Sequence, residues 1–184
     1  MNSVVIKDKE FELFIDSETI ETSINRMAEK MNKDLKELDP VFIVVLNGSF
    51  MFAGELMKHV SIPCEITFVR LSSYQGTSSS EKVYEILGLN GSIEGRTVVI
   101  VEDIVDTGHT MKSLLAQLNV HHPKEIKIST LLFKPKALVE KIDLDYVALE
   151  IPNDFIVGYG LDYDGYGRNL RNIYKLKNSD FNEI

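Results

Sequence analysis

Arg96 to Met111 has the sequence RTVVIVEDIVDTGHTM, and this stretch decides the fold of the chain. It begins with an apolar, β-branched run, Thr97 to Val101, which predicts a buried strand. The run stops at two adjacent acids, Glu102 and Asp103. A short polar loop, Asp106 to Thr110, leads into a helical pattern of apolar residues. The order predicts a strand–loop–helix unit with polar groups at the carboxyl end of the strand.

Such a unit suits a phosphorylated sugar. The start of a helix presents unpaired N–H groups and a partial positive charge to an anion, and Gly108 allows the backbone to approach it closely. Thr107 and Thr110 can add hydroxyl donors. Glu102 and Asp103 can accept hydrogen bonds from two vicinal hydroxyls or hold Mg2+. Each part alone also has a structural explanation, since a Thr-Gly-x-Thr loop can simply cap a helix. The full order of apolar strand, acid pair, polar loop and helix is a far more specific indication of a phosphosugar site than any of its parts.

Composition narrows the possible classes of protein. With 184 residues, 44% of them hydrophobic, the chain is expected to form a single domain, residues 1–184. The net charge of −8 argues against a general nucleic-acid or membrane-surface binder, and it implies that a polyphosphate ligand would arrive with a divalent cation. Cys64 is the only cysteine, which suits the cytosol. Acids and lysines interrupt the N-terminal apolar residues, so no signal peptide is predicted, and no apolar run approaches the length of a membrane span.

Apolar runs alternate with helical patterns along the chain, which predicts an α/β fold with a mostly parallel sheet. The expected strands are 3–15 (with a turn), 41–46, 64–71, 83–87, 97–101, 125–133 and 145–151, and the expected helices are 20–38, 50–60, one from 111 onward and a short piece at 137–142.

Three further segments carry polar groups that these elements do not require. Asn47-Gly48-Ser49 follows a buried strand, where ligands bind in parallel sheets, although a plain turn is the alternative. Ser72 to Lys82, SSYQGTSSSEK, is expected to be a mobile loop that could act as a lid or merely link a hairpin. Pro152 to Leu170 is expected to be an ordered loop rich in glycine, tyrosine and acids.

Together these segments resemble the hypoxanthine-guanine phosphoribosyltransferase family, of bacterial type, over nearly the whole chain. VVIVEDIVDTGHT resembles the phosphoribosyl-diphosphate (PRPP) signature of the type I phosphoribosyltransferases. Leu46 to Ser49 and Ser73-Tyr74 are similar to two further family motifs. Phe155 to Tyr163, followed by Arg168-Asn169-Leu170, points to the 6-oxopurine branch. The resemblance implies a central parallel sheet flanked by helices, with a small hood formed by the N- and C-terminal segments.

The resemblance also implies how PRPP is held. The polar loop would bind the 5-phosphate, the two acids would hold the ribose hydroxyls directly or through Mg2+, and Arg168 and the turn after Leu46 would embrace the diphosphate. Many relatives have lysine where this chain has Asn47, so this turn lacks one cation. The implied PRPP-binding residues are Asn47, Gly48, Glu102, Asp103, Asp106, Thr107, Gly108, His109, Thr110 and Arg168, and the implied metal ligands are Glu102, Asp103 and Asp162.

For the purine, the resemblance implies stacking on Phe155, a hydrogen bond from Lys134 to the exocyclic oxygen, and reading of the opposite edge by the Ile156 backbone. Asp162 would complete the purine site and help a second Mg2+. Asp106 would be the catalytic residue that takes or shares the proton of the five-membered-ring nitrogen. Taken without the resemblance, Lys134 could equally be a solvated strand end.

The implied function is Mg2+-dependent purine salvage: transfer of the phosphoribosyl group from PRPP to hypoxanthine, and also to guanine, forming IMP or GMP and diphosphate. The enzyme would be a cytoplasmic homodimer or homotetramer without nucleic-acid or membrane partners, and Ser73 and Tyr74 would open a lid over the reacting centre. The alternative is a regulator of the same fold that senses PRPP or a nucleotide without catalysis. Asn47 favours that alternative, whereas the net charge and the lack of a basic stripe argue against a nucleic-acid-binding regulator.

Overall fold

The structure is a computed structural model that describes residues 2–75, 82–89 and 91–177. Its helices are α1 (Ser17–Asp34), α2 (Phe50–His59) and α3 (His109–Asn119). Its strands are β1 (Ser3–Ile6), β2 (Lys9–Ile15), β3 (Val41–Leu46), β4 (Glu65–Gln75), β5 (Lys82–Leu87), β6 (Thr97–Val105), β7 (Glu125–Phe133), β8 (Tyr146–Glu150), β9 (Ile156–Val157) and β10 (Ile173–Leu176).

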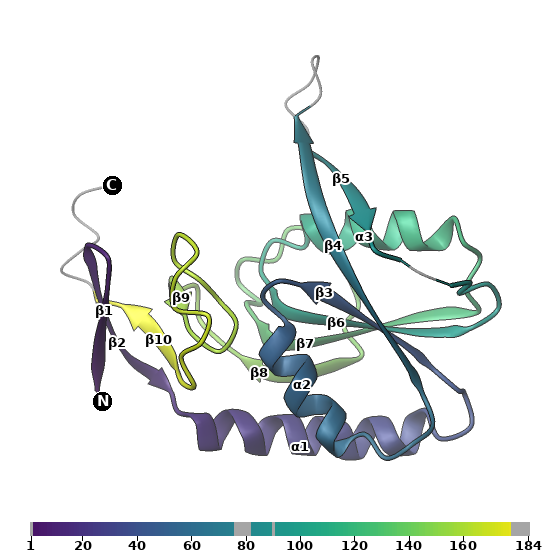
Figure 1. Cartoon of the computed structure of the whole chain (residues 1–184), viewed down its shortest axis with the longest axis horizontal. Coiled ribbons are helices and arrows are strands. Elements are labelled where there is room, and N and C mark those ends of the chain that lie inside the picture. The colour runs from purple at the N-terminus through teal and green to yellow at the C-terminus, as the bar shows by residue number, and fades with distance from the viewer. Residues whose placement is uncertain (1, 76–81, 90, 178–184) are drawn as a thin grey trace.

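The strands form two sheets (Figure 1). The larger has the order β5-β4-β3-β6-β7-β8, in which every neighbouring pair is parallel except β4 with β5. The smaller is antiparallel, with the order β1-β2-β10-β9, and joins segments from both ends of the chain. The predicted class, a mostly parallel sheet flanked by helices beside a small sheet from both ends of the chain, is confirmed.

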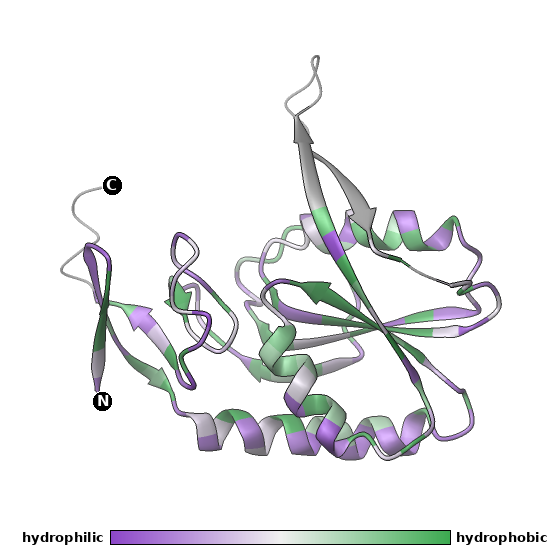
Figure 2. Ribbon diagram, in the orientation of Figure 1, coloured by the Kyte–Doolittle hydropathy of each residue, from purple (hydrophilic) through white to green (hydrophobic). Residues whose placement is uncertain are grey.

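The central strands are apolar because both faces of the sheet are covered. In β3 the first five residues are all buried, and the strand is green, that is hydrophobic, in Figure 2. The first five residues of β6 are also buried, and all of them except Thr97 are apolar. α1 and α2 cover one face, where their side chains pack with Phe42 and Leu131. α3 covers the other face and packs with Ile43 and Ile100. This arrangement accounts for strands without the alternation of a half-exposed sheet.

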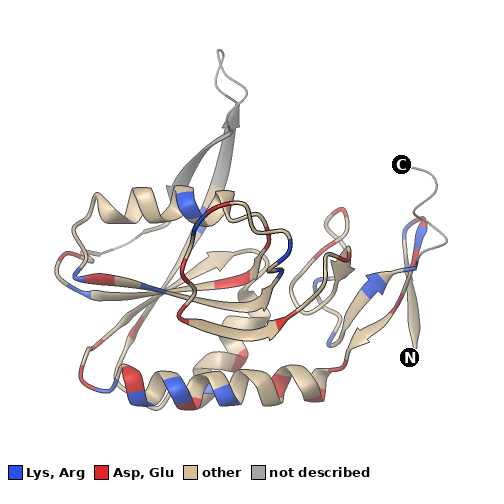
Figure 3. Cartoon of the chain, turned by 180° about the vertical axis from the view of Figure 1, so that it is seen from behind, with Lys and Arg blue, Asp and Glu red and all other residues tan. Residues whose placement is uncertain are grey.

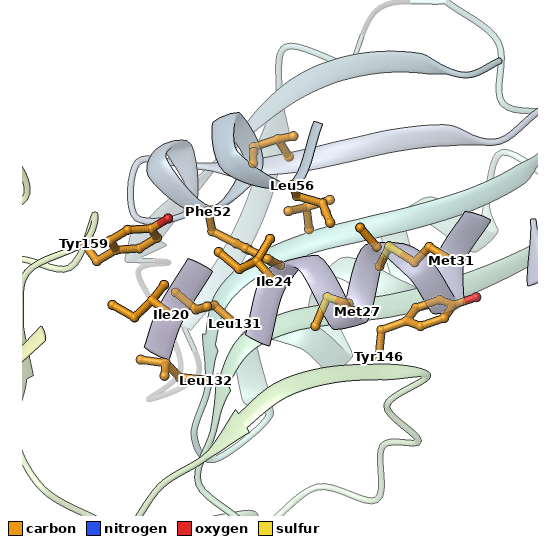
Figure 4. Close-up of a cluster of buried hydrophobic side chains, with 14 of the residues drawn as sticks. Ile20, Ile24, Met27, Met31, Phe52, Leu56, Leu131, Leu132, Tyr146 and Tyr159 are labelled. Carbon is orange, nitrogen blue, oxygen red and sulfur yellow. The ribbon is translucent and has the colours of Figure 1, made fainter. Parts of the chain in front are cut away.

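α1 buries one face along its whole length. Ile20, Ile24, Met27 and Met31 recur at helical spacing and lie against β7, β8 and α2 (Figure 4). Acidic and basic residues, red and blue in Figure 3, are interspersed along the helix. Asp16 caps the N-terminus by accepting a 2.8 Å hydrogen bond from the Thr19 amide. None of the described helices meets the length and apolarity that a membrane crossing would require.

Two strands are longer than predicted. β6 continues past the expected end at Val101, because its pairing with β7 extends to Val105 opposite Phe133. β4 continues to Gln75 opposite Lys82 of β5, so the start of the expected lid loop is strand. In both cases backbone partners, and not side-chain polarity, decide where the strand ends. The rest of that loop, residues 76–81, lies outside the described residues.

The helical piece predicted at 137–142 is wrong. The Ala137 amide closes one turn onto the Lys134 carbonyl, but the next amides, those of Val139 and Glu140, donate to the Thr107 carbonyl instead. A helix cannot continue once its amides bond to another segment. α1 also ends earlier than predicted, at Asp34 and not at residue 38.

The loop predicted at 152–170 is mostly irregular but contains β9, which pairs with the unpredicted β10. Strands as short as these, of two and four residues, carry too little periodicity to be seen in the sequence.

Candidate active site

The loop after β6 encloses a pocket at the carboxyl end of the parallel sheet. Gly108 caps α3 with a φ of +87°, a conformation that glycine adopts without strain. α3 therefore begins at His109, two residues earlier than predicted, and the polar loop leads straight into its first turn. The pocket is lined by Glu102, Ile104, Val105, Asp106, Thr107, Gly108, Thr110 and Met111. Helix N-terminus, hydroxyls and acid thus converge as the sequence predicts, in a form suited to an anion attached to a polyol.

Glu102 and Asp103 point to opposite sides of β6, as successive strand residues do. Glu102 lines the loop pocket, and its Oε2 is buried without a hydrogen-bond partner among the described residues. Burial, reinforced by the charge of Asp103, raises the pKa of Glu102 well above its usual value. A buried acceptor without a donor indicates that a ligand group completes this site.

Asp103 lies on the other side, against the turn after β3. Its carboxylate is so close to Gly48 that a methyl group on Gly48 would stand 1.5 Å from Asp103 Oδ2. Burial is the largest influence on Asp103 and raises its pKa to about 6, although a hydrogen bond from the Ile104 amide and the charge of Arg168 act in the opposite direction. The folded chain thus holds a carboxyl pair whose ionisation is disfavoured.

These raised pKa values predict a specific pH dependence of stability. A carboxyl group whose pKa is higher in the folded than in the unfolded state destabilises the fold as pH rises from the unfolded value towards the folded one. For Asp103 that window runs from 3.8 to about 6. Asp103→Asn should therefore be more stable than wild type at pH 7.5, by up to about 3 kcal/mol at roughly 1.4 kcal/mol per pH unit between the two pKa values. The gain should vanish near pH 4.

Thermal unfolding of both ligand-free proteins between pH 4 and pH 7.5 checks this expectation. A gain of equal size at both pH values would show that the Asp103 carboxylate is as well solvated in the folded protein as in the unfolded one.

Gly48 is also in contact with the tail of the chain. A methyl group on Gly160 would lie 1.9 Å from the Gly48 carbonyl oxygen, so the two backbones touch. Between Gly158 and Gly160, Tyr159 is buried beside Phe52 of α2 (Figure 4). Tyr159 anchors this part of the tail in the core, and only glycine fits at the approach of Gly160 to the turn.

Arg168 binds two residues of the tail segment that contacts Gly48. Its Nη1 donates to the Gly160 carbonyl at 2.8 Å, and its Nη2 lies 2.6 Å from Asp162 Oδ1. The other Asp162 oxygen accepts from the Gly165 amide at 2.7 Å. Since these contacts occupy both carboxylate oxygens, the metal role predicted for Asp162 competes with its ion pair to Arg168.

Lys134 and Asp106 meet at the ends of β7 and β6. Lys134 Nζ lies 3.3 Å from Asp106 Oδ2, and the Lys134 amide donates to the Val105 carbonyl at 3.0 Å. The Lys134 side chain is only 9% exposed, compared with 43% for that of Asp106. A buried lysine with a carboxylate partner is not a solvated strand end. In this pair the half-exposed Asp106 carboxylate is a hydrogen-bond acceptor, and the adjacent Lys134 ammonium is a donor.

Phe155 and Ile156 lie at the edge of the smaller sheet. Phe155 is 42% exposed, and its ring rests against Phe11 and, edge to face, against Tyr163, with centroids 6.2 and 5.9 Å away. The Leu176 amide donates to the Phe155 carbonyl at 2.9 Å. In an antiparallel pair the next residue faces outward, so the N–H and C=O of Ile156 point away from β10 at the open edge of β9.

Mg2+ fits this site only with the help of ligand oxygens. Among the described residues no three His, Cys, Asp or Glu side chains form a group that could hold a metal ion, so Glu102, Asp103 and Asp162 do not form a complete cage. Mg2+ commonly binds through one or two carboxylates, waters and substrate phosphates. The unpartnered oxygen of Glu102 and the adjoining Asp103 suit that mode.

Sequence reasoning missed two residues, Glu140 and Tyr159, and the phosphate contact predicted for His109 stays a prediction. The His109 side chain does not line the loop pocket; its Nδ1 lies 3.0 Å from Glu140 Oε1. Glu140 was not recognised because nothing in its local sequence marks a residue that contacts another 31 positions away. Tyr159 could have been noticed, since an aromatic residue between two glycines indicates an anchored turn.

Comparison with known proteins agrees with this geometry. A family model described as the phosphoribosyl transferase domain matches residues 15–164. The chain is 47% identical over 153 residues to the hypoxanthine-guanine phosphoribosyltransferase of Streptococcus pyogenes, covering 83% of this chain and 85% of that protein. It is 38% identical over 172 residues to the protein of the same name from Streptococcus thermophilus, covering 93% and 96%.

A solved structure of a related enzyme has the same fold over most of the chain. The crystal structure of a hypoxanthine phosphoribosyltransferase from Staphylococcus aureus superposes with a TM-score of 0.83 at 35% identity, covering 92% of this chain and 93% of that one. A type I phosphoribosyltransferase fold, a family model that matches residues 15–164 and relatives matched over most of their length lead to one conclusion. The chain belongs to the hypoxanthine-guanine phosphoribosyltransferase family and is an enzyme of that family.

Proposed function

We propose that the chain, as one domain of residues 1–184, catalyses Mg2+-dependent transfer of the 5-phosphoribosyl group from PRPP to hypoxanthine, and also to guanine, forming IMP or GMP and diphosphate. The observation that carries the proposal is the Lys134–Asp106 pair, whose Nζ and Oδ2 are 3.3 Å apart and whose Asp106 lines the loop pocket. This pair offers a purine one donor and one acceptor beside a site built for a sugar phosphate.

On the donor side, the 5-phosphate would occupy the pocket of Asp106 to Thr110. Glu102, with its unpartnered oxygen, and Asp103, on the other side of β6, would hold the ribose hydroxyls, directly or through Mg2+. The diphosphate would lie between the Asn47–Gly48 turn and Arg168. Bound Mg2+ would neutralise the negative charge that builds on the leaving diphosphate. Arg168 would stabilise the same charge, and Asn47 could contribute only dipoles where many relatives have a cation.

On the purine side, Phe155 supplies an exposed ring face for stacking, and Ile156 supplies an outward-facing N–H and C=O for the opposite edge. Lys134 would donate to the exocyclic oxygen, with Asp162 at the side of the site. Asp106 would accept the proton of the attacking ring nitrogen, a contribution typically worth ~10²–10⁴-fold.

The decisive experiment is an assay of nucleotide formation from PRPP with hypoxanthine, guanine, xanthine, adenine and uracil, each with Mg2+ and with EDTA. We expect turnover of hypoxanthine and guanine that EDTA abolishes. Activity confined to adenine or uracil would overturn the 6-oxopurine assignment. Tight PRPP binding without turnover of any base would favour the alternative, a regulator of the same fold.

Lys134→Met should lose the preference for a purine with an exocyclic oxygen. The ammonium group only donates, so adenine, which presents an amino group there, would offer it no acceptor. A hydrogen bond to a charged group contributes about 1.5–3 kcal/mol, so the ratio of kcat/KM for hypoxanthine over adenine should fall roughly 10- to 100-fold.

Lys136→Met is the matched control, since Lys136 is exposed and lies only two residues further along the chain. A preference for hypoxanthine that survives undiminished in Lys134→Met would show that another group reads the oxygen.

Assembly, compartment and lid complete the proposal. We expect a cytoplasmic homodimer or homotetramer, to be measured by light scattering; a structural study of the Trypanosoma cruzi relative addresses the role of its C-terminal region in its oligomeric state and activity. The lid assigned to Ser73 and Tyr74 is supported only by their place near the end of β4, beside residues 76–81.

A further inference from the structure

A segment that the proposed mechanism does not use lies against the loop Asp106 to Thr110. This loop is called the phosphate loop here, because the proposed function places the 5-phosphate in it. This segment, residues 135–142, connects β7 to β8 and is called the strap here. Its Val139 and Glu140 amides both donate to the Thr107 carbonyl at 3.1 Å. A methyl group on Gly108 would come within 3.1 Å of the side chains of Leu138, Glu140 and Ile142. The strap therefore fits the outer side of the loop without space for a side chain between them.

The backbone contacts have a consequence for the pocket. A peptide unit points its N–H and C=O in opposite directions. The Thr107 carbonyl is held on the strap side by two donors, so the amide of the same peptide unit, that of Gly108, points the other way. That orientation suits anion binding, in which successive backbone N–H groups face the ligand.

The Glu140 side chain also links the strap to the start of α3. Its Oε1 lies 3.0 Å from His109 Nδ1, and its Oε2 lies 2.8 Å from Lys112 Nζ. His109 and Lys112 are one turn apart at the start of α3. The Glu140 side chain is 20% exposed, whereas His109 and Lys112 are 57% and 66% exposed. The hydrogen bond from Lys112, followed by that from His109, outweighs the effect of burial and lowers the pKa of Glu140, so it is a carboxylate at neutral pH.

A carboxylate beside the first turn of α3 would by itself repel a phosphate. Here its charge is engaged by the Lys112 ammonium and by His109, on the outer side of the loop. Glu140 therefore opposes an anion in the pocket less than a free carboxylate would, while it holds the strap to the helix. Val139 and Glu140 of the strap therefore hold the loop and the start of α3 by two backbone hydrogen bonds and two side-chain contacts.

We infer that Glu140 is a positioning residue that orders the phosphate loop for the 5-phosphate of the donor by tying the strap to the first turn of α3. The inference rests on the proposed function only in naming that phosphate. It predicts that loss of the Glu140 side chain weakens binding of a sugar phosphate without affecting the diphosphate side of the site, where Arg168 and Gly48 lie.

The test measures binding by calorimetry, without turnover. The probes are ribose 5-phosphate, which carries the 5-phosphate but no diphosphate, and diphosphate with Mg2+, which lacks the 5-phosphate. Glu140→Ala should weaken ribose 5-phosphate about tenfold, as expected for a lost charged hydrogen bond, and should leave diphosphate unchanged. Glu140→Gln, whose amide oxygen can still accept from Lys112, should restore most of the affinity.

Asp143→Ala is the matched control, because it removes an exposed acid from the same connection between β7 and β8. It should bind both probes like wild type. Equal or tighter binding of ribose 5-phosphate by Glu140→Ala would overturn the inference, as would equal weakening of both probes or the same loss in Asp143→Ala.

Kinetics separates this inference from the proposed function. In an active enzyme, Glu140→Ala should raise KM for PRPP and leave kcat and KM for the purine near wild type, whereas an unchanged KM for PRPP would overturn the inference alone. Wild-type protein that binds ribose 5-phosphate in a Glu140-dependent way but converts no purine would overturn the proposed function and leave the inference standing.

Discussion

Asp106→Asn is expected to lower kcat by roughly 10²- to 10⁴-fold, the range typical for loss of a general base, while the fold and PRPP binding stay intact. Asp106 is the first residue after β6, with its side chain 43% exposed and its Oδ2 3.3 Å from Lys134 Nζ. Asparagine has the same shape and can still accept a hydrogen bond from Lys134, but its amide does not take up a proton at neutral pH. The loss should therefore appear in turnover and not in affinity.

Single-turnover kinetics with hypoxanthine, together with the dissociation constant of PRPP, would measure the two effects separately. Asp143→Asn serves as the control, because Asp143 is an exposed acid outside the pocket. Turnover of Asp106→Asn comparable to wild type would show that water or the substrate alone handles the proton.

Gly48→Ala is expected to lower kcat/KM for PRPP by at least ~10²-fold, since a misplacement of about 1 Å at a reacting centre can cost that much. The new methyl group would stand 1.5 Å from Asp103 Oδ2 and 2.5 Å from its carboxyl carbon, so the carboxylate or the turn must move. The turn cannot move freely in the other direction, because its carbonyl touches Gly160. Overpacking of this kind also typically costs about 1–3 kcal/mol of stability.

Gly54→Ala is the matched control. Gly54 lies in α2, and a methyl group there would meet nothing within 4 Å. Alanine should raise the free energy of unfolding by roughly 0.5–1 kcal/mol through helix propensity and leave kinetics unchanged. Thermal unfolding and PRPP kinetics of both variants check the pair. Wild-type kcat/KM in Gly48→Ala would show that Asp103 is free to move aside without loss of function.

The sequence by itself determined the sheet and the position of the loop. Val41 to Leu46 and Glu125 to Phe133 are the predicted bounds of β3 and β7. Val41 to Leu46 is a continuous apolar run, as a strand buried on both faces requires, whereas Glu125 to Phe133 is apolar only in part and is buried mainly in its second half. The amphipathic spacing from Ile20 to Met31 likewise predicted the buried face of α1. In the same way, the segment Glu102 to Thr110 located a pocket, since its acids, glycine and helix start are adjacent in the chain; that this pocket binds an anion stays a prediction.

Only the tertiary structure decided what depends on distant partners. β6 extends through Glu102 and Asp103 because β7 continues to pair with it, and the segment at 137–142 is no helix because its amides bond to Thr107. The contacts of Gly48 with Asp103 and Gly160, and of Glu140 with His109, join residues 31 to 112 positions apart. The periodicity of apolar residues indicates which side of a helix or strand is buried. It does not indicate which group of a distant segment comes within hydrogen-bond distance.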